Sequence, residues 1–278
     1  MPECFRNQAY VEKLVLGLKK AKQPERELIS GSPTDEPPAP PSVEAPPQWQ
    51  PKTLVRTCIS SLANSDDFGP QMAAEADARG FYSAGKRAFL GDGQAYNWTI
   101  QRQWFANFTP IADFIHVVEY LYEAAKALGG TAVSCWQQYV HWANLCWQGR
   151  VGAVLEDLQR HLPPSAEVAV ADGESETVKV VHRTWNYLTN NRARMDYARY
   201  RREGLPVTSS LAESLVKQIS KRVKGTEKFW DDGASGEAIL QVRAAVISQD
   251  GRLARFLRDR PISPHSPRCR IPPLATAV

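Results

Sequence analysis

The sequence has few cysteines and no long apolar runs. Its five cysteines, at positions 4, 58, 135, 146 and 269, form no Cys-x-x-Cys pair, which argues against a zinc ribbon and a disulfide framework. Neither a membrane-spanning run nor a signal-peptide pattern is present, so we expect a cytoplasmic protein with no membrane partner. The motifs GxxxxGK[ST], HExxH and GxSxG are also missing, which removes the commonest nucleotide-binding and hydrolase classes.

Positive charge is concentrated in one part of the chain. The 278 residues include 34 Lys+Arg and 30 Asp+Glu, a net charge of +4. Between Lys179 and Lys228 there are twelve Lys/Arg and four Asp/Glu, so this stretch carries 12 − 4 = +8 and the remainder −4. Such a basic region is typical of a protein that binds a phosphate backbone, although a solvated helical face has the same composition.

Prolines mark the ends of the organised part. Residues 21–52 hold nine of the twenty prolines, and a second proline-rich segment covers 261–278. We therefore divide off residues 1–52 as a short helix (8–20) with a proline-rich linker, and residues 259–278 as a disordered tail.

Between these segments, predicted strands first alternate with helices and then stop. The apolar patterns predict strands at 54–60, 86–93 and 109–114, and helices at 68–85 and 96–108. Only helices are predicted from 114 to 205, one of them running from 176 to 202, and further helices follow at 209–230 and 236–248. The expected class is α/β but mostly helical overall, with an α/β part (53–116), a helical insertion (117–205) and C-terminal helices (206–258).

Polar side chains stand where two of the predicted strands end. Asp92 lies between Gly91 and Gly93 after an apolar run. Functional residues of open α/β sheets collect at the carboxyl ends of strands, but Gly-Asp-Gly also makes an ordinary turn. Asp113 and His116 form an Asp-x-x-His pair, for which a metal or phosphate role competes with N-capping by Asp113.

Glu213 is a single carboxylate in the first turn of the basic amphipathic helix predicted at 209–230. It is either a surface residue or a metal ligand beside bound phosphates. Together with Asp92, it indicates a nuclease-type site in which carboxylates hold two Mg²⁺ ions. Basic side chains would then neutralise DNA phosphates, and the residues expected to do so are Arg192, Arg194, Arg199, Arg201, Arg202, Lys217, Lys221, Arg222, Lys224 and Lys228.

Four stretches carry a family resemblance: KRAFLGDGQAYNW (86–98), PIADFIHVVEYLYEAAKAL (110–128), YLTNNRARMDYARYRREGLPVTSSLAES (187–214) and KRVKGTEKFWDDGASGEAILQVRAA (221–245). On these motifs the chain resembles, over about residues 53–258, the DDE transposases of bacterial insertion sequences, specifically the ISKra-like group. The resemblance implies an RNase H-like fold interrupted by an all-helical insertion domain. It also implies Mg²⁺-dependent cleavage and strand transfer of DNA at transposon ends and target sites.

By position, the resemblance makes Asp92 the second catalytic aspartate and Glu213 the catalytic glutamate, both as metal ligands. Asp113 and His116 match an accessory Asp-x-x-His element. The first catalytic aspartate belongs on an earlier strand, and nothing before Lys52 provides one. We therefore expect an N-terminally truncated transposase, with an incomplete RNase H-like domain and little or no catalysis.

Two alternatives stay open at the level of the sequence. The chain is a non-catalytic DNA-binding fragment that interferes with an intact transposase, or it is a relic that a separate upstream polypeptide could complete. An unpaired sheet edge would favour association with such a polypeptide or with a second copy of the chain.

Overall fold

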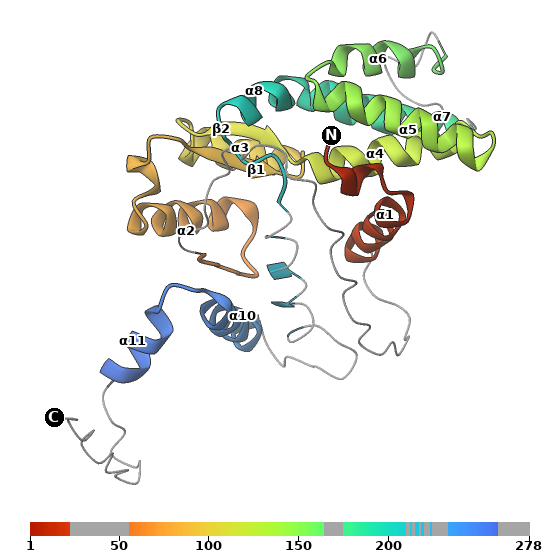
Figure 1. Ribbon diagram of the computed structural model, residues 1–278. Coiled ribbons are helices and arrows are strands. Elements are labelled where there is room, and N and C mark those ends of the chain that lie inside the picture. Colours follow the sequence, from red (N-terminus) through yellow and green to blue (C-terminus); the bar gives the residue numbers. More distant parts are fainter. Residues whose placement is uncertain are drawn as a thin grey trace, which may run out of the picture. The chain divides into compact units, whose positions relative to one another are not determined.

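The computed structural model describes residues 1–22, 56–163, 175–209, 212, 215, 216, 218, 219, 223 and 233–260 (Figure 1). The chain forms two compact units, the first from residues 1–52 and 63–216 and the second from 53–62 and 217–278. The described residues are mostly helical with one small parallel sheet, as the predicted class requires. None of the helices in these ranges combines the length and apolar character needed to cross a bilayer.

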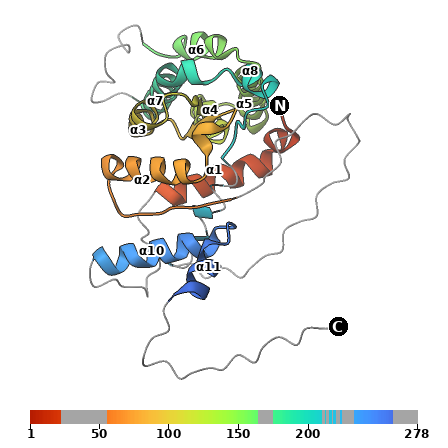
Figure 2. The ribbon, with the colours of Figure 1, turned by 90° about the vertical axis from the view of Figure 1, so that its left-hand side faces the viewer.

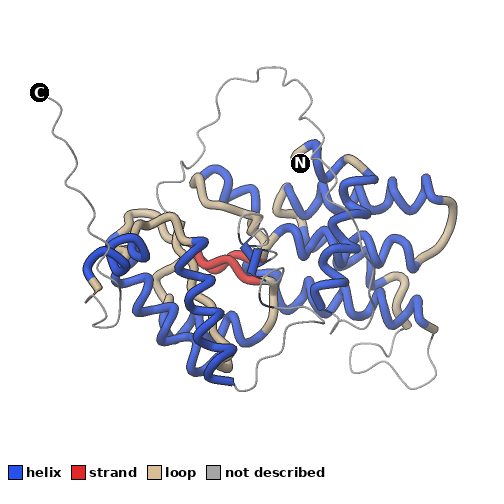
Figure 3. Tube along the Cα trace, turned by 90° about the horizontal axis from the view of Figure 1, so that it is seen from below, coloured by secondary structure: helices blue, strands red, loops and turns tan. Residues whose placement is uncertain are grey.

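The sheet of the first unit has two parallel strands, β1 (Ala88–Gly91) and β2 (Thr109–Ala112), which Figure 3 shows side by side. Helix α3 (Ala95–Trp104) connects them, and its predicted place in the chain is confirmed together with that of both strands. Parallel strands end at the same edge of a sheet, and the N–H of Asp113 donates to the carbonyl of Gly91 at 2.8 Å. The residues that follow the two strands, Asp92 and Asp113, therefore occupy one edge.

Helix α4 (Phe114–Ala127) is the centre of this unit. Ten of its fourteen residues are buried, and two of these, His116 and Glu119, are polar. It contacts α1 (Gln8–Lys22), α5 (Ala132–Trp147) and α7 (Glu176–Asn191), while α6 (Val151–Gln159) packs on α5 and α7. Figure 2 views α4, α5 and α7 close to end-on. Helix α2 (Ser65–Ala78) packs against α3.

The helix predicted at residues 8–20 is confirmed, and it belongs to the same core. Val11 and Val15 are buried. In the short 3-10 helix η1 (Glu3–Arg6), which precedes α1, the ring of Phe5 lies 5.3 Å from that of Phe114, edge to face. The hydroxyl of Tyr139 donates to the carbonyl of Phe5 at 3.0 Å. The beginning of the chain is thus packed against α4 and α5.

The single helix predicted from 176 to 202 is wrong. Helix α7 ends at Asn191, the 3-10 turn η3 (Arg192–Arg194) follows, and α8 (Tyr197–Arg202) begins anew. The Asp196 carboxylate caps α8 by accepting from the N–H of Arg199 at 3.1 Å. The break turns Met195 and Tyr197 into the core, where both are buried, and this burial decides the local structure over helix propensity.

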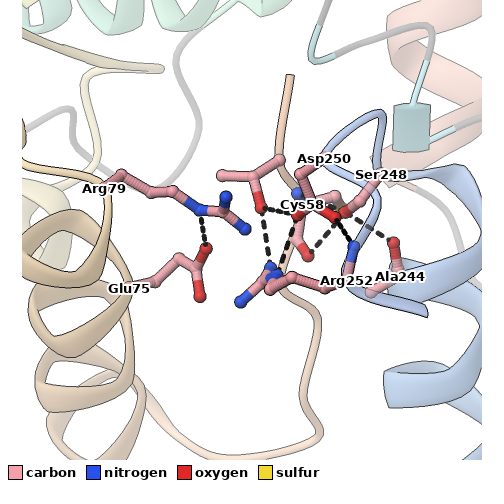
Figure 4. Close-up of polar contacts among 8 residues, drawn as sticks. Cys58, Glu75, Arg79, Ala244, Ser248, Asp250 and Arg252 are labelled. Atoms are coloured by element: carbon pink, nitrogen blue, oxygen red, sulfur yellow. Dashed lines mark hydrogen bonds and ion pairs between the residues drawn. The ribbon is translucent and has the colours of Figure 1, made fainter. Parts of the chain in front are cut away.

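The strand predicted at 54–60 is also wrong, over the part of it that the structure describes. Residues 56–60 have no regular secondary structure and run beside the junction of α10 (Gly233–Ile247) and α11 (Arg252–Asp259) in the second unit. The N–H of Gln249 donates to the carbonyl of Arg56 at 2.8 Å, and the Ser248 hydroxyl accepts from the N–H of Cys58 at 2.9 Å (Figure 4). Because a helix end and a hydroxyl take these backbone groups, they are not available for a strand ladder. Helix α10 confirms the helix predicted at 236–248.

Several predictions concern residues outside the described ranges. These include most of the proline-rich linker, the tail from 261 on, Glu213, and five of the residues expected to bind DNA, Lys217, Lys221, Arg222, Lys224 and Lys228. Within the helix predicted at 209–230, the residues that the structure describes from Ala212 to Val223 are helical.

Candidate functional site

Asp92 lies half-exposed in the loop that follows β1. Its Oδ1 accepts hydrogen bonds from the N–H of Gln94 at 3.0 Å and from Nδ2 of Asn97 at 2.7 Å. Its other oxygen, Oδ2, accepts no hydrogen bond from the described residues. The loop is a turn, as one interpretation of Gly-Asp-Gly expected, but it also holds a carboxylate with one fixed oxygen and one oxygen available to a ligand.

Helix α7 holds this loop in place. The hydroxyl of Tyr187 donates to the carbonyl of Asp92 at 3.1 Å, and Nδ2 of Asn191 donates to the carbonyl of Gly93 at 3.3 Å. The Oδ1 of Asn191 accepts from Nε1 of Trp98 on α3 at 2.8 Å, and the Asn191 side chain is buried. The amide of Asn191 thereby joins three elements, β1 through its loop, α3 and α7.

Gly93 is required by this close approach. Its φ is +96°, in the region that favours glycine. A Cβ at this position would lie 2.4 Å from Cε2 of Tyr187 and 2.9 Å from Nδ2 of Asn191, closer than van der Waals contact allows. The second glycine of the motif therefore serves the junction between the Asp92 loop and α7.

Asp113 caps α4 and is almost completely buried, with 1% of its surface exposed. Its Oδ1 accepts from the N–H groups of Ile115 and Ser209, both at 3.1 Å. Its Oδ2 lies 3.2 Å from Nδ1 of His116 and also accepts from the hydroxyl of Ser209. The capping interpretation is confirmed. Since protein groups occupy both oxygens, the arrangement suits a positioning residue better than a metal ligand.

His116 completes this cluster, with its Nδ1 against the Asp113 carboxylate. Burial lowers the pKa of His116. The hydrogen bond and charge of Asp113, with smaller effects of Asp92 and Glu119, raise the pKa by more than burial lowers it, so the net pKa lies above 6.5. The N–H of Phe114 also donates to the carbonyl of Val207 at 3.0 Å. These contacts fix residues 207–209 at the edge of the sheet, only four positions before Glu213.

A groove of about 480 Å³ opens beside the Asp92 loop, between α3 and α7. Residues three, four and seven positions apart share one face of a helix, and each of the two helices contributes such a face. The groove is lined by Gly93, Gln94, Ala95, Trp98, Thr99, Arg102, Tyr120, Arg183, Tyr187, Asn190, Asn191 and Arg194. Three of these residues are arginines and none is an acid, so the groove is suited to an anion.

Of the predicted DNA-binding arginines that the structure describes, Arg194 lines this groove. Arg192 and Arg202 are exposed, and neither lines it. The expectation for these two residues stays a prediction.

The other two predicted arginines are engaged with neighbouring groups. Arg199 lies 3.4 Å from Asp196 and 3.6 Å from Glu203, so acidic side chains already balance its charge. The guanidinium of Arg201 lies 4.2 Å from the ring centroid of Trp147 and donates to the Trp147 carbonyl at 3.0 Å. These contacts favour a structural role for Arg201.

The described ranges contain no group of three or more His, Cys, Asp or Glu side chains placed to hold a metal ion. Sequence reasoning did not assign a role to Arg102, Arg183, Tyr187, Asn191 or Ser209, all of which contribute to the groove or to the sheet edge.

Comparison of the chain with protein-family models, with curated proteins and with solved structures found no match.

Proposed function

We propose that this chain acts in DNA transposition as part of a DDE-type transposase with an RNase H-like site at the carboxyl edge of β1 and β2. The observation that carries the proposal is the carboxylate of Asp92. It stands at the end of a parallel strand, is fixed through one oxygen, and lies next to an arginine-lined groove. A metal ligand beside a phosphate-binding surface is what cleavage and joining of DNA require.

Mg²⁺ fits the available oxygen of Asp92, because this ion prefers carboxylate ligands and keeps waters that substrate phosphates can replace. Glu213 would be the second ligand. It follows Ser209 by four residues, which span at most about 14 Å, so a chain anchored on Asp113 can bring it to the sheet edge. When bound, a pair of such ions would supply activation of water or a 3′-hydroxyl and stabilisation of the leaving oxygen.

Asp113 lies at the same edge of the sheet, but protein groups occupy both of its oxygens, so it does not supply the third carboxylate of a DDE site. Among the residues that the structure describes, β1 pairs with β2 alone, so its other edge makes no strand pairing. Open edges accept strands from other chains. We therefore propose that the chain alone cleaves DNA little or not at all, and that a strand from another polypeptide, bearing the missing aspartate, would complete the site.

The experiment is a paired test of binding and cleavage with the full chain. Affinity for duplex DNA is expected to fall steeply as salt rises, with no nicking of plasmid DNA in Mg²⁺ or Mn²⁺. The parent chain could instead nick DNA, with the nicking abolished by Asp92→Ala and by Glu213→Ala but not by the exposed control Asp67→Ala. This result would show a complete site and refute the expected inactivity. No DNA binding, or binding that salt does not affect, would overturn the proposal as a whole.

A non-catalytic DNA-binding protein is the second candidate function. The excess of eight positive charges between Lys179 and Lys228 motivates it, because backbone phosphates can be bound by basic side chains alone. The discriminating measurement adds a polypeptide bearing the strand and aspartate of a related transposase. Restored cleavage supports the transposase, and DNA binding without cleavage in the mixture supports the second candidate.

A further inference from the structure

The groove between α3 and α7 brings two guanidinium groups to one side of Asp92. Arg102 is exposed on α3, and its Nη2 donates to Oγ1 of Thr99 at 3.2 Å. Arg194 lies over the ring of Trp98, 4.5 Å from the centroid, and its Nη1 donates to the carbonyl of Asn190 at 3.0 Å. Stacking and hydrogen bonding thus hold Arg194 in a defined position, with donors to spare.

The positive charge in the groove is not balanced by the residues that line it, since none of them is acidic. Burial, and next the charge of Arg102, lower the pKa of Arg194, which means that the two cations disfavour each other. An anion bound between them would offset this repulsion. Phosphate oxygens match the planar fork of arginine donors.

Helix α3 adds to the attraction for an anion. It begins at Ala95, which lines the groove, and its N-cap residue Gln94 makes no side-chain capping bond. The positive end of the helix dipole therefore lies beside the groove. Arg183 stands apart from this arrangement, because its Nη2 pairs with Oε2 of Glu123 at 2.6 Å.

We infer that the groove binds a backbone phosphate of the DNA strand that is cut at Asp92, with Arg102 and Arg194 as the two residues that contact this phosphate. The inference rests on the proposed function and adds to it the position of the strand. Gly93 and Gln94 line the groove and directly follow Asp92, so a strand held there continues to the Asp92 carboxylate. The bound phosphate would set the register of the strand at the cleavage position.

The test measures the affinity of the full chain for fluorescein-labelled single-stranded and duplex DNA over a range of salt concentrations. Arg102→Ala is the first variant, because the Arg102 side chain is exposed and its hydrogen bond to Thr99 is exposed as well. It should weaken binding by about tenfold and reduce the slope of log affinity against log salt by about one. Arg160→Ala is the matched control: it removes the same charge from the exposed C-cap residue that follows α6, outside the groove, and should bind DNA as the parent chain does.

A second variant tests the geometry of the site separately from its charge. Arg194→Lys keeps the cation but loses the planar fork and the stacking on Trp98, so it should weaken DNA binding although net charge is unchanged. The inference would be overturned, and the proposed function would stand, if three variants bound DNA with the affinity of the parent chain: Arg102→Ala, Arg194→Lys and Arg160→Ala. A parent chain that binds no DNA would overturn both.

Inorganic phosphate and thymidine monophosphate distinguish a DNA strand from a free anion as the source of the phosphate. Both should displace labelled DNA only at concentrations far above those at which unlabelled DNA does so. Variants that lose affinity for these small anions but keep full affinity for DNA would assign the groove to a free phosphate compound and overturn the inference.

Discussion

Tyr187 on α7 donates its hydroxyl hydrogen to the carbonyl oxygen of Asp92 at 3.1 Å, while its ring stacks on Tyr120 with 3.9 Å between centroids. Burial, above all, raises the pKa of Tyr187 well above 10, so this hydroxyl keeps its proton and remains a donor at any pH at which the protein would be studied. A helix in the segment predicted as an insertion therefore controls the conformation of the candidate metal ligand.

Replacing Tyr187 with phenylalanine should cost about 1 kcal/mol of unfolding free energy, because one intramolecular hydrogen bond is lost while the ring stacking remains. Urea denaturation would measure the change, with Tyr10→Phe on an exposed ring as the control. Equal stability of both variants would mean that the hydroxyl does not hold the Asp92 loop.

Three glycine-to-alanine variants separate backbone strain from steric overlap. Gly85 has no positive φ and open space around it, so Gly85→Ala should be neutral or stabilise by about 0.5 kcal/mol. Gly80 has a φ of +69° but equally open space, so its variant should cost about 1 kcal/mol. Gly93→Ala adds the overlap with Tyr187 and should cost about 3 kcal/mol or more. If Gly93→Ala lowers the unfolding free energy no more than Gly80→Ala does, the packing of α7 on the Asp92 loop is contradicted.

The pair of His116 and Asp113 should make stability depend on pH. The folded-state pKa of His116 is raised, so its contribution is fully present below the ordinary value of about 6.5 and is lost as pH rises through the folded-state value. Unfolding free energy, measured from about pH 6 to pH 9, should therefore fall more for the parent chain than for His116→Gln. Parallel curves for the two proteins would show that the imidazolium does not stabilise the sheet edge.

In the second unit, Asp250 is a titratable residue whose pKa is shifted by its hydrogen bonds. Burial raises the pKa of Asp250. Hydrogen bonds from the Arg252 N–H, the Thr57 hydroxyl and the Arg252 guanidinium lower the pKa by more than burial raises it, to about 2 (Figure 4). Its contribution is therefore present above about 3.8 and is lost as pH falls through about 2.

Asp250→Asn should weaken the attachment of residues 56–62 to the α10–α11 junction, by about 2 kcal/mol, because charge-assisted hydrogen bonds are lost. Backbone hydrogen exchange in this segment should become faster at neutral pH. Asp259→Asn, at an exposed pair with Arg258, should leave that exchange unchanged. Exchange as slow as in the parent would exclude Asp250 as the residue that attaches the segment.

Local patterns were enough to predict β1, β2, α3 and α4, because strand alternation and helical periodicity are written in neighbouring residues. They were not enough for residues 56–60, whose β-branched and apolar side chains favour a strand. There the backbone partners are Ser248 and Gln249, nearly 200 positions away, and no local pattern records them.

The candidate site shows the same division. The place of Asp92 at the end of β1 could be predicted because it follows an apolar run, and the cap at Asp113 because it precedes a helix. The role of Asn191 could not, since its partners Trp98 and Gly93 belong to a different segment. A signal was nevertheless present: Arg183, Tyr187, Asn190 and Asn191 recur at helical spacing on one face of α7, and a polar face with two amides and a tyrosine suggests a contact to backbone groups.

The bonds from α7 to the Asp92 loop join residues 95 and 98 positions apart. During synthesis, the loop cannot reach its final conformation until α7 has left the ribosome, and contacts of such separation form late and slowly in folding. A fragment that ends after α4 would keep both strands but not the loop geometry. The candidate site therefore cannot be studied in an excised α/β part, and any dissection of this protein has to keep β1 and α7 on the same polypeptide.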